Sequence, residues 1–215
     1  MLIDTHMHER TCSTDSFLSL KEIVDIARQK GLDGVCITDH DSMGLKEFAE
    51  AYSRQVNFPI FVGVEYYSIQ GDIVAFGIDH VPEGRIEAQE FVDMVKSQGG
   101  VCFSAHPFRN NNRGLEENLK TVKGLDGIEA LNGSASYEAN KKAFEYAQML
   151  GIQAVGSSDC HVPGKVGVYA TYLPETVATL DEFIQAFKKG QCRPAYYENG
   201  AYHVIEEWPD RLPQN

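Results

Sequence analysis

This sequence of 215 residues contains neither a long apolar run nor a basic, apolar leading segment. A membrane-spanning helix needs roughly 20 consecutive apolar residues, so we expect no membrane partner and a cytoplasmic location. Cysteine is also scarce, because only five cysteines are scattered along the chain and none belongs to a CxxC pair. That spacing favours reduced thiols over a disulfide framework or a cysteine-bound zinc site.

Basic residues are outnumbered, since 19 Lys and Arg face 31 Asp and Glu, which gives a formal net charge of -12. The sequence has no stripe of Lys and Arg of the kind that tracks a phosphate backbone. We therefore expect no long nucleic acid as a partner. A small phosphorylated substrate is compatible with this charge, because divalent cations neutralise the carboxylates around them and can hold a phosphate.

Hydrophobic residues make up 43% of the chain, which is enough to bury one good core. Strand and helix signals alternate along it; one helix, for example, starts at a capping box on Ser19 and ends at Gly31. Residues 72–78 predict an extra strand that pairs as a hairpin with the strand before it. With no internal linker, we predict one α/β domain over residues 1–195, and a tail over 196–215 that packs on it or extends it.

Histidines and carboxylates follow the apolar runs of this pattern. His6 and His8 stand two residues apart at the end of the first run, so an extended strand would direct both imidazoles to one side. Later runs end at His40, Glu65, His106, Asp159 and His161. Because the loops that follow parallel strands gather at the carboxyl end of a sheet, we expect all these side chains to converge on one rim.

The ligand chemistry of this set narrows the metal and the reaction. Imidazoles combined with carboxylates, without a pair of thiolates, suit zinc, manganese or iron, and a carboxylate such as Glu65 can bridge two ions. So many ligands exceed what one ion coordinates, which indicates a multinuclear site. Closely spaced divalent ions activate water and polarise a phosphoryl oxygen, so the set predicts metal-assisted hydrolysis.

The segments that carry these residues resemble, in order, the successive motifs of the PHP (polymerase and histidinol phosphatase) family. They are residues 4–8, 37–41, 63–65, 105–107 and 156–161. The similarity spans about residues 1–195, with compatible spacing between the motifs. The resemblance implies a single-domain, distorted (β/α)7 barrel with the metal site at the carboxyl end of its strands. It also implies two or three divalent ions (Zn, Mn or Fe) and the hydrolysis of phosphoesters.

Carried over to this chain, the resemblance assigns metal-binding and catalytic roles to seven residues. These are His6, His8, His40, Glu65, His106, Asp159 and His161, with Glu65 as the bridging carboxylate. Asp15, in the loop after the first motif, resembles a further ligand. Asn132 stands where some members have another histidine. Asp72 lies near a position where relatives often have a histidine, and we do not count it as a ligand.

Three cations follow predicted ligands closely and are candidates for binding phosphate, namely Arg10, Arg109 and Lys165. The function that we expect is hydrolysis of a small phosphomonoester, such as a histidinol-phosphate-like compound or a nucleotide phosphate, by a metal-bound hydroxide. One alternative is a phosphodiesterase or exonuclease that acts at nucleotide ends, and another is an amidohydrolase-like activity. A non-catalytic, metal-stabilised module is least favoured, because this chain keeps nearly all of the ligands.

Overall fold

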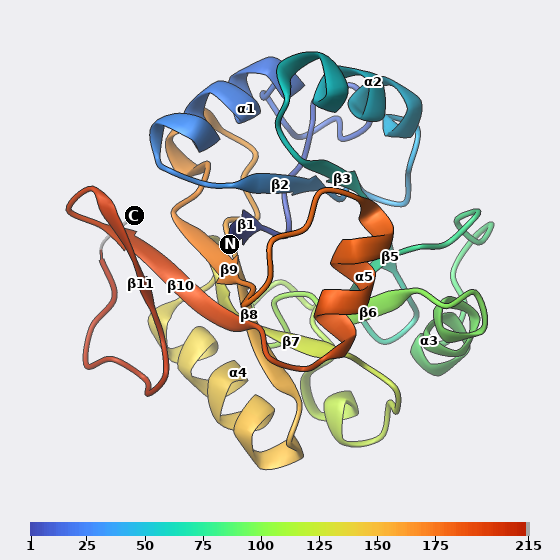
Figure 1. Ribbon diagram of the computed structural model, residues 1–215. Coiled ribbons are helices and arrows are strands. Elements are labelled where there is room, and N and C mark those ends of the chain that lie inside the picture. Colours follow the sequence, from blue (N-terminus) through green and yellow to red (C-terminus); the bar gives the residue numbers. More distant parts are fainter. Residues whose placement is uncertain (214–215) are drawn as a thin grey trace.

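The strand and helix signals fold into two sheets with helices packed around them, as the computed structural model of residues 1–213 shows (Figure 1). The first sheet has the strand order β11-β10-β9-β1-β2-β3. Its strands are β1 (Leu2–Asp4), β2 (Gly34–Ile37), β3 (Ile60–Val62), β9 (Tyr169–Tyr172), β10 (Arg193–Glu198) and β11 (Ala201–Val204). The strands from β1 to β3 are parallel, whereas β9, β10 and β11 each pair antiparallel with their neighbours.

The second sheet has the strand order β4-β5-β6-β7-β8. Its strands are β4 (Val64–Tyr67), β5 (Asp72–Phe76), β6 (Val101–Ser104), β7 (Gly127–Asn132) and β8 (Gln153–Ser157). The strands from β6 to β8 are parallel, and β5 is antiparallel to both β4 and β6. The hairpin partner predicted over residues 72–78 is thereby confirmed as β5.

The two sheets meet along two seams, and backbone hydrogen bonds cross both of them. At one seam the Gly63 amide donates to the Ile37 carbonyl at 2.9 Å. At the other seam the Asp159 amide donates to the His6 carbonyl, also at 2.9 Å. The structure therefore shows a mixed α/β domain of two joined sheets. The closed (β/α)7 barrel stays a prediction, because antiparallel strands interrupt the strand-helix repeat.

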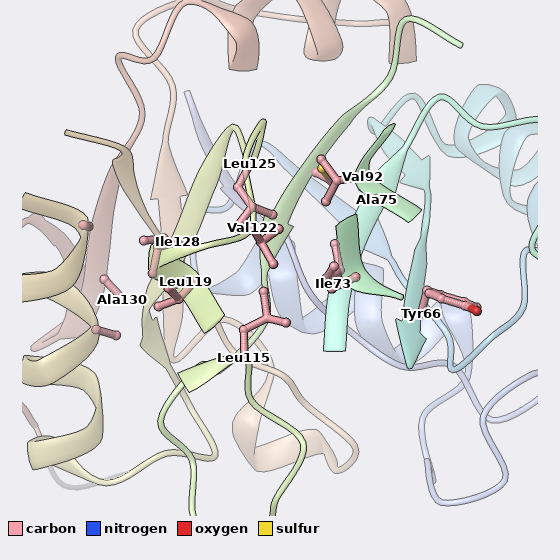
Figure 2. Close-up of a cluster of buried hydrophobic side chains, with 14 of the residues drawn as sticks. Tyr66, Ile73, Ala75, Val92, Leu115, Leu119, Val122, Leu125, Ile128 and Ala130 are labelled. Carbon is pink, nitrogen blue, oxygen red and sulfur yellow. The ribbon is translucent and has the colours of Figure 1, made fainter. Parts of the chain in front are cut away.

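Side chains alternate between two cores along the strands. In β5, Ile73 and Ala75 face an outer cluster, whereas Val74 and Phe76 face an inner cluster that also takes residues from the first sheet. Figure 2 shows the outer cluster, in which Ile73 and Val92 pack with side chains of other elements. This cluster is covered by α3 (Ala88–Ser97), the 3-10 helix η1 (Glu116–Lys120) and α4 (Tyr137–Leu150).

Two further helices, α1 (Leu20–Gln29) and α2 (Lys46–Val56), cover the first sheet at the top of Figure 1. The last helix, α5 (Leu180–Lys188), instead closes the inner core. It lies near Gly99, just before β6 begins, because the Lys188 side chain donates to the Gly99 carbonyl. Helix α5 thus covers the amino end of the parallel strands. The carboxyl end, where the predicted ligands follow the strands, is not covered by this helix. Each helix within residues 1–213 is too short or too polar to cross a membrane.

Phe183 of α5 is fully buried, and its ring centroid lies 5.2 Å from that of Phe61 and 5.1 Å from that of Phe76. Replacing it by Ala leaves a cavity in the inner core, so we expect Phe183→Ala to lower the free energy of unfolding by about 3–5 kcal/mol. Phe48→Ala is the matched control, because Phe48 is 61% exposed on α2, and we expect a change within about 0.5 kcal/mol. Denaturant unfolding measures both. Equal losses in the two variants would contradict the inner core described here.

Candidate metal centre

The seven strand-end residues converge on the carboxyl rim. His6 and His8 follow β1, Glu65 lies within β4, and the others come from the turns after β2, β6 and β8, namely His40, His106, Asp159 and His161. The turns are sharp, since φ is +28° at His106 and +49° at Asp159. Residues other than glycine seldom adopt positive φ, and such strain tends to occur at functional sites.

The Glu65 carboxylate lies at the centre of this group. Its Oε1 is 2.8 Å from His106 Nε2 and 3.5 Å from His6 Nε2. Its Oε2 is 2.7 Å from His40 Nδ1 and 3.6 Å from His8 Nε2. The two oxygens therefore face separate pairs of imidazoles, which is the arrangement that lets one carboxylate bridge two ions.

Two aspartates complete the ring of donors. Asp159 Oδ1 lies 3.3 Å from His8 Nε2 and 3.7 Å from His161 Nδ1. Asp15 Oδ2 lies 3.2 Å from His40 Nε2 and 3.4 Å from His161 Nε2. The structure thus brings Asp15 to the rim, beside the two most exposed imidazoles of the set.

The donor atoms fit divalent ions. Three groups of side chains each offer ligand atoms that lie within 4.8 Å of one another: His8, His40 and His161; His6, His8 and Asp159; and Glu65, Asp72 and His106. Within residues 1–213, buried His40 Nδ1 and Glu65 Oε2 form no hydrogen bond of normal geometry, although they face each other. Nitrogen and oxygen atoms left in this way are available to a borderline or hard cation.

Burial and nearby carboxylates act differently on the first two histidines. Burial lowers the pKa of His8 to about 4, which keeps its imidazole in the neutral form that binds metals. Burial also acts to lower the pKa of His6, but the Glu129, Glu65 and Asp159 carboxylates outweigh it and raise that pKa well above its usual value. A cation at the rim would replace the proton that these carboxylates favour.

Glu129 of β7 is a fully buried residue that the strand-end pattern did not indicate. Its Oε1 is 3.1 Å from His6 Nδ1 and accepts a hydrogen bond from Ser157. Its Oε2 accepts from the His106 amide at 2.6 Å and from Asn132 Nδ2 at 2.9 Å. A carboxylate that holds one ring nitrogen of a histidine directs the other nitrogen toward the ion. The sequence feature that could have indicated Glu129 is its charge within the otherwise uncharged run of residues 127–132.

A cavity of about 110 Å³ opens at the rim. Six of the predicted ligands line it, together with Asp72, Arg109, Asn111 and Arg113. Arg109 Nη1 donates to Asp159 Oδ2 at 3.0 Å, so this predicted phosphate-binding residue lies at the candidate metal centre.

The other two predicted cations lie elsewhere. Arg10 is exposed and is not among the residues that line the rim cavity. Lys165, in the 3-10 helix η2 (Pro163–Lys165), lines a separate cavity of about 430 Å³ beside the C-terminal segment. Of the three cations predicted from their closeness to a ligand in the sequence, only Arg109 lines the rim cavity.

Residues 137–192, from the start of α4 to the residue before β10, match a family model described as PHP-associated. A relative in Methanocaldococcus jannaschii, an uncharacterized protein, is 25% identical over 142 residues, which cover 61% of this chain and 82% of the relative. The fold is similar to that of a protein from Bifidobacterium adolescentis assigned as a metal-dependent phosphoesterase. The TM-score is 0.67 at 19% identity, over 86% of this chain and 96% of that one.

Two further solved structures share the fold. PsfC from Pseudomonas syringae PB-5123 has a TM-score of 0.72 at 18% identity, with 93% of each chain covered. A lesion-specific endonuclease from Pyrococcus furiosus, EndoQ, has a TM-score of 0.62 at 18% identity, over 90% of this chain and 58% of that one. Likeness to an endonuclease lends no support to our expectation that long nucleic acids are excluded. The PHP-associated segment, the order of the motifs and the shared fold all make the chain similar to proteins of the PHP domain family.

Proposed function

We propose that this chain is a metal-dependent phosphoesterase that hydrolyses a small phosphomonoester. The observation that carries the proposal is Glu65, whose two oxygens face two pairs of imidazoles at a small cavity lined also by guanidinium groups. Divalent ions held there would polarise a phosphoryl oxygen and lower the pKa of a water molecule. The cavity of about 110 Å³ suits a compact anionic group.

Side chains at the rim would hold the ions in fixed positions and bind the phosphate. His6, His8 and Glu65 are buried, so their donor atoms face the rim in fixed orientations, and Glu129 fixes His6 further through Nδ1. Arg109 is about one-third exposed beside Asp159, where its remaining N–H groups can donate to non-bridging phosphoryl oxygens. Those contacts would strengthen as charge shifts onto the oxygens in the transition state.

Cleavage at nucleotide ends is the second candidate, and one feature of the rim favours it. Phe17 is 72% exposed, and its amide donates to the His161 carbonyl at 2.9 Å, so the backbone of an exposed aromatic residue adjoins a predicted ligand. A base could stack on such a ring, whatever its identity. The net charge of -12 weighs against a long polyanion but not against a mononucleotide or a terminal nucleotide.

A substrate panel tests the proposal. Protein reloaded with manganese, zinc or iron would be assayed on phosphomonoesters, dinucleotides and short oligonucleotides. We expect the highest kcat/KM with a phosphomonoester, loss of turnover on chelation, and recovery when the ion is restored. Faster release of nucleotides from dinucleotides or oligonucleotides would favour the second candidate. No hydrolysis with any ion would reject both.

The role of Glu65 gives a sharper prediction. Glu65→Ala removes the carboxylate that faces both imidazole pairs, so we expect turnover to fall by about a thousandfold or more while the fold persists. Glu47→Ala on α2 is the control, because Glu47 is exposed and is not among the residues that line the rim cavity. Steady-state kinetics and circular dichroism read the two effects separately. A folded Glu65→Ala variant with parental turnover would place the active site elsewhere.

A further inference from the structure

Asp72 and Arg113 form an ion pair at the rim cavity that neither the motif pattern nor the candidate ligands required. Arg113 Nε donates to Asp72 Oδ2 at 2.7 Å, and Nη2 donates to Oδ1 at 3.0 Å. The Asp72 side chain is 1% exposed and that of Arg113 is 31% exposed. A side-on pair of this kind fixes the plane of the guanidinium as well as its position.

The backbone and an aromatic ring fix Arg113 further. The Asp72 amide donates to the Arg113 carbonyl, and the Arg113 amide donates to Asn111 Oδ1 at 3.1 Å. Arg113 Cζ lies 4.5 Å from the centroid of the Tyr67 ring. These contacts make the guanidinium of Arg113 rigid before any ligand arrives.

One edge of this guanidinium remains open. The pair with Asp72 uses Nε and Nη2, and within residues 1–213 no hydrogen bond involves Arg113 Nη1. Arg113 lines the rim cavity together with Arg109 and Asn111, all from the loop after His106. That loop folds tightly on itself, because a methyl group at Gly114 would lie 2.1 Å from the Pro107 carbonyl oxygen. The three side chains are therefore presented to the cavity by a compact turn.

We propose that Arg113 binds the terminal phosphoryl group of the substrate and that Asp72 is its positioning residue. This inference rests on the proposed function, and it names the group that selects a phosphomonoester. A terminal phosphoryl group carries more charge than a diester and offers more free oxygens. A second guanidinium at the cavity that Arg109 also lines therefore favours the monoester.

The competing role for Asp72 is that of a metal ligand. Its Oδ2 lies 3.7 Å from His106 Nε2, and it belongs to one of the three groups of candidate donors. Both of its oxygens, however, already accept hydrogen bonds from Arg113. A buried carboxylate fully engaged by a guanidinium is a poorer donor to an ion than Glu65 or Asp159. The two roles predict opposite effects on metal content.

The test uses metal-loaded protein and four variants: Arg113→Gln, Asp72→Asn, the double variant, and Arg85→Gln as control. Arg85 stacks on Tyr67 but does not line the cavity. Isothermal titration with inorganic phosphate gives the dissociation constant, elemental analysis gives ions per chain, and kinetics separate KM from kcat. For Arg113→Gln we expect phosphate affinity to fall and KM to rise, each by about tenfold, with unchanged ions per chain. Arg85→Gln should match the parent.

Asp72→Asn should weaken phosphate binding in the same direction. The double variant should be no worse than Arg113→Gln alone, because a positioning residue has no effect once its partner is gone. Parental phosphate affinity in Arg113→Gln would overturn the proposal. Loss of an ion in Asp72→Asn but not in Arg113→Gln would also overturn it, by making Asp72 a ligand. Should Asp72→Asn fail to fold, Arg113→Gln and Arg85→Gln decide alone. Phosphate binding that depends on Arg113 in a protein without phosphatase activity would keep the inference and reject the proposed function.

Discussion

The site depends on one buried carboxylate, that of Glu65, which lies where the two sheets join. Its oxygens face four imidazoles, which offset the large cost of removing a charge from water. Its backbone also joins the two sheets, since its amide donates to the Asp39 carbonyl and its carbonyl accepts from the Asp41 amide. The chain reaches this position by passing close to β5 at Gly63, where a methyl group would lie 2.4 Å from the Ala75 carbonyl oxygen. The seam between the sheets is therefore also the place where the candidate ligands meet.

Stability and chemistry are divided between the two ends of the parallel strands. Aromatic rings and α5 fill the amino end, whereas polar residues occupy the carboxyl end. Glu129 connects the two regions, because it lies within a buried strand and still reaches His6 and the amide of His106. Arg109 and Arg113 add positive charge to a cavity that carboxylates also line, and they pair with Asp159 and Asp72. An acidic chain can thus present a locally balanced surface to a phosphate.

Much of the rim was predictable from sequence, because a histidine or acid directly after a buried strand has only one end of the sheet to occupy. Residues whose roles depend on a distant partner were not. Arg113 stands seven positions after His106, and its contacts with Asp72 and Tyr67, which are distant in sequence, hold it at the cavity. Glu129 looked like part of an apolar strand. The hairpin of β4 and β5 was predicted, but the antiparallel pairing of β9 with β1 was not, since hydrophobic patterning does not report strand direction.

Glu65 is placed so that its two oxygens could each bind one of two ions, and anomalous diffraction tests this role most directly. Crystals of protein loaded with manganese or zinc would be measured on both sides of the absorption edge of the metal. We predict at least two anomalous peaks at the rim, with one oxygen of Glu65 directed at each of two neighbouring peaks. A single peak bound away from Glu65, or none at the rim of fully loaded protein, would contradict the account.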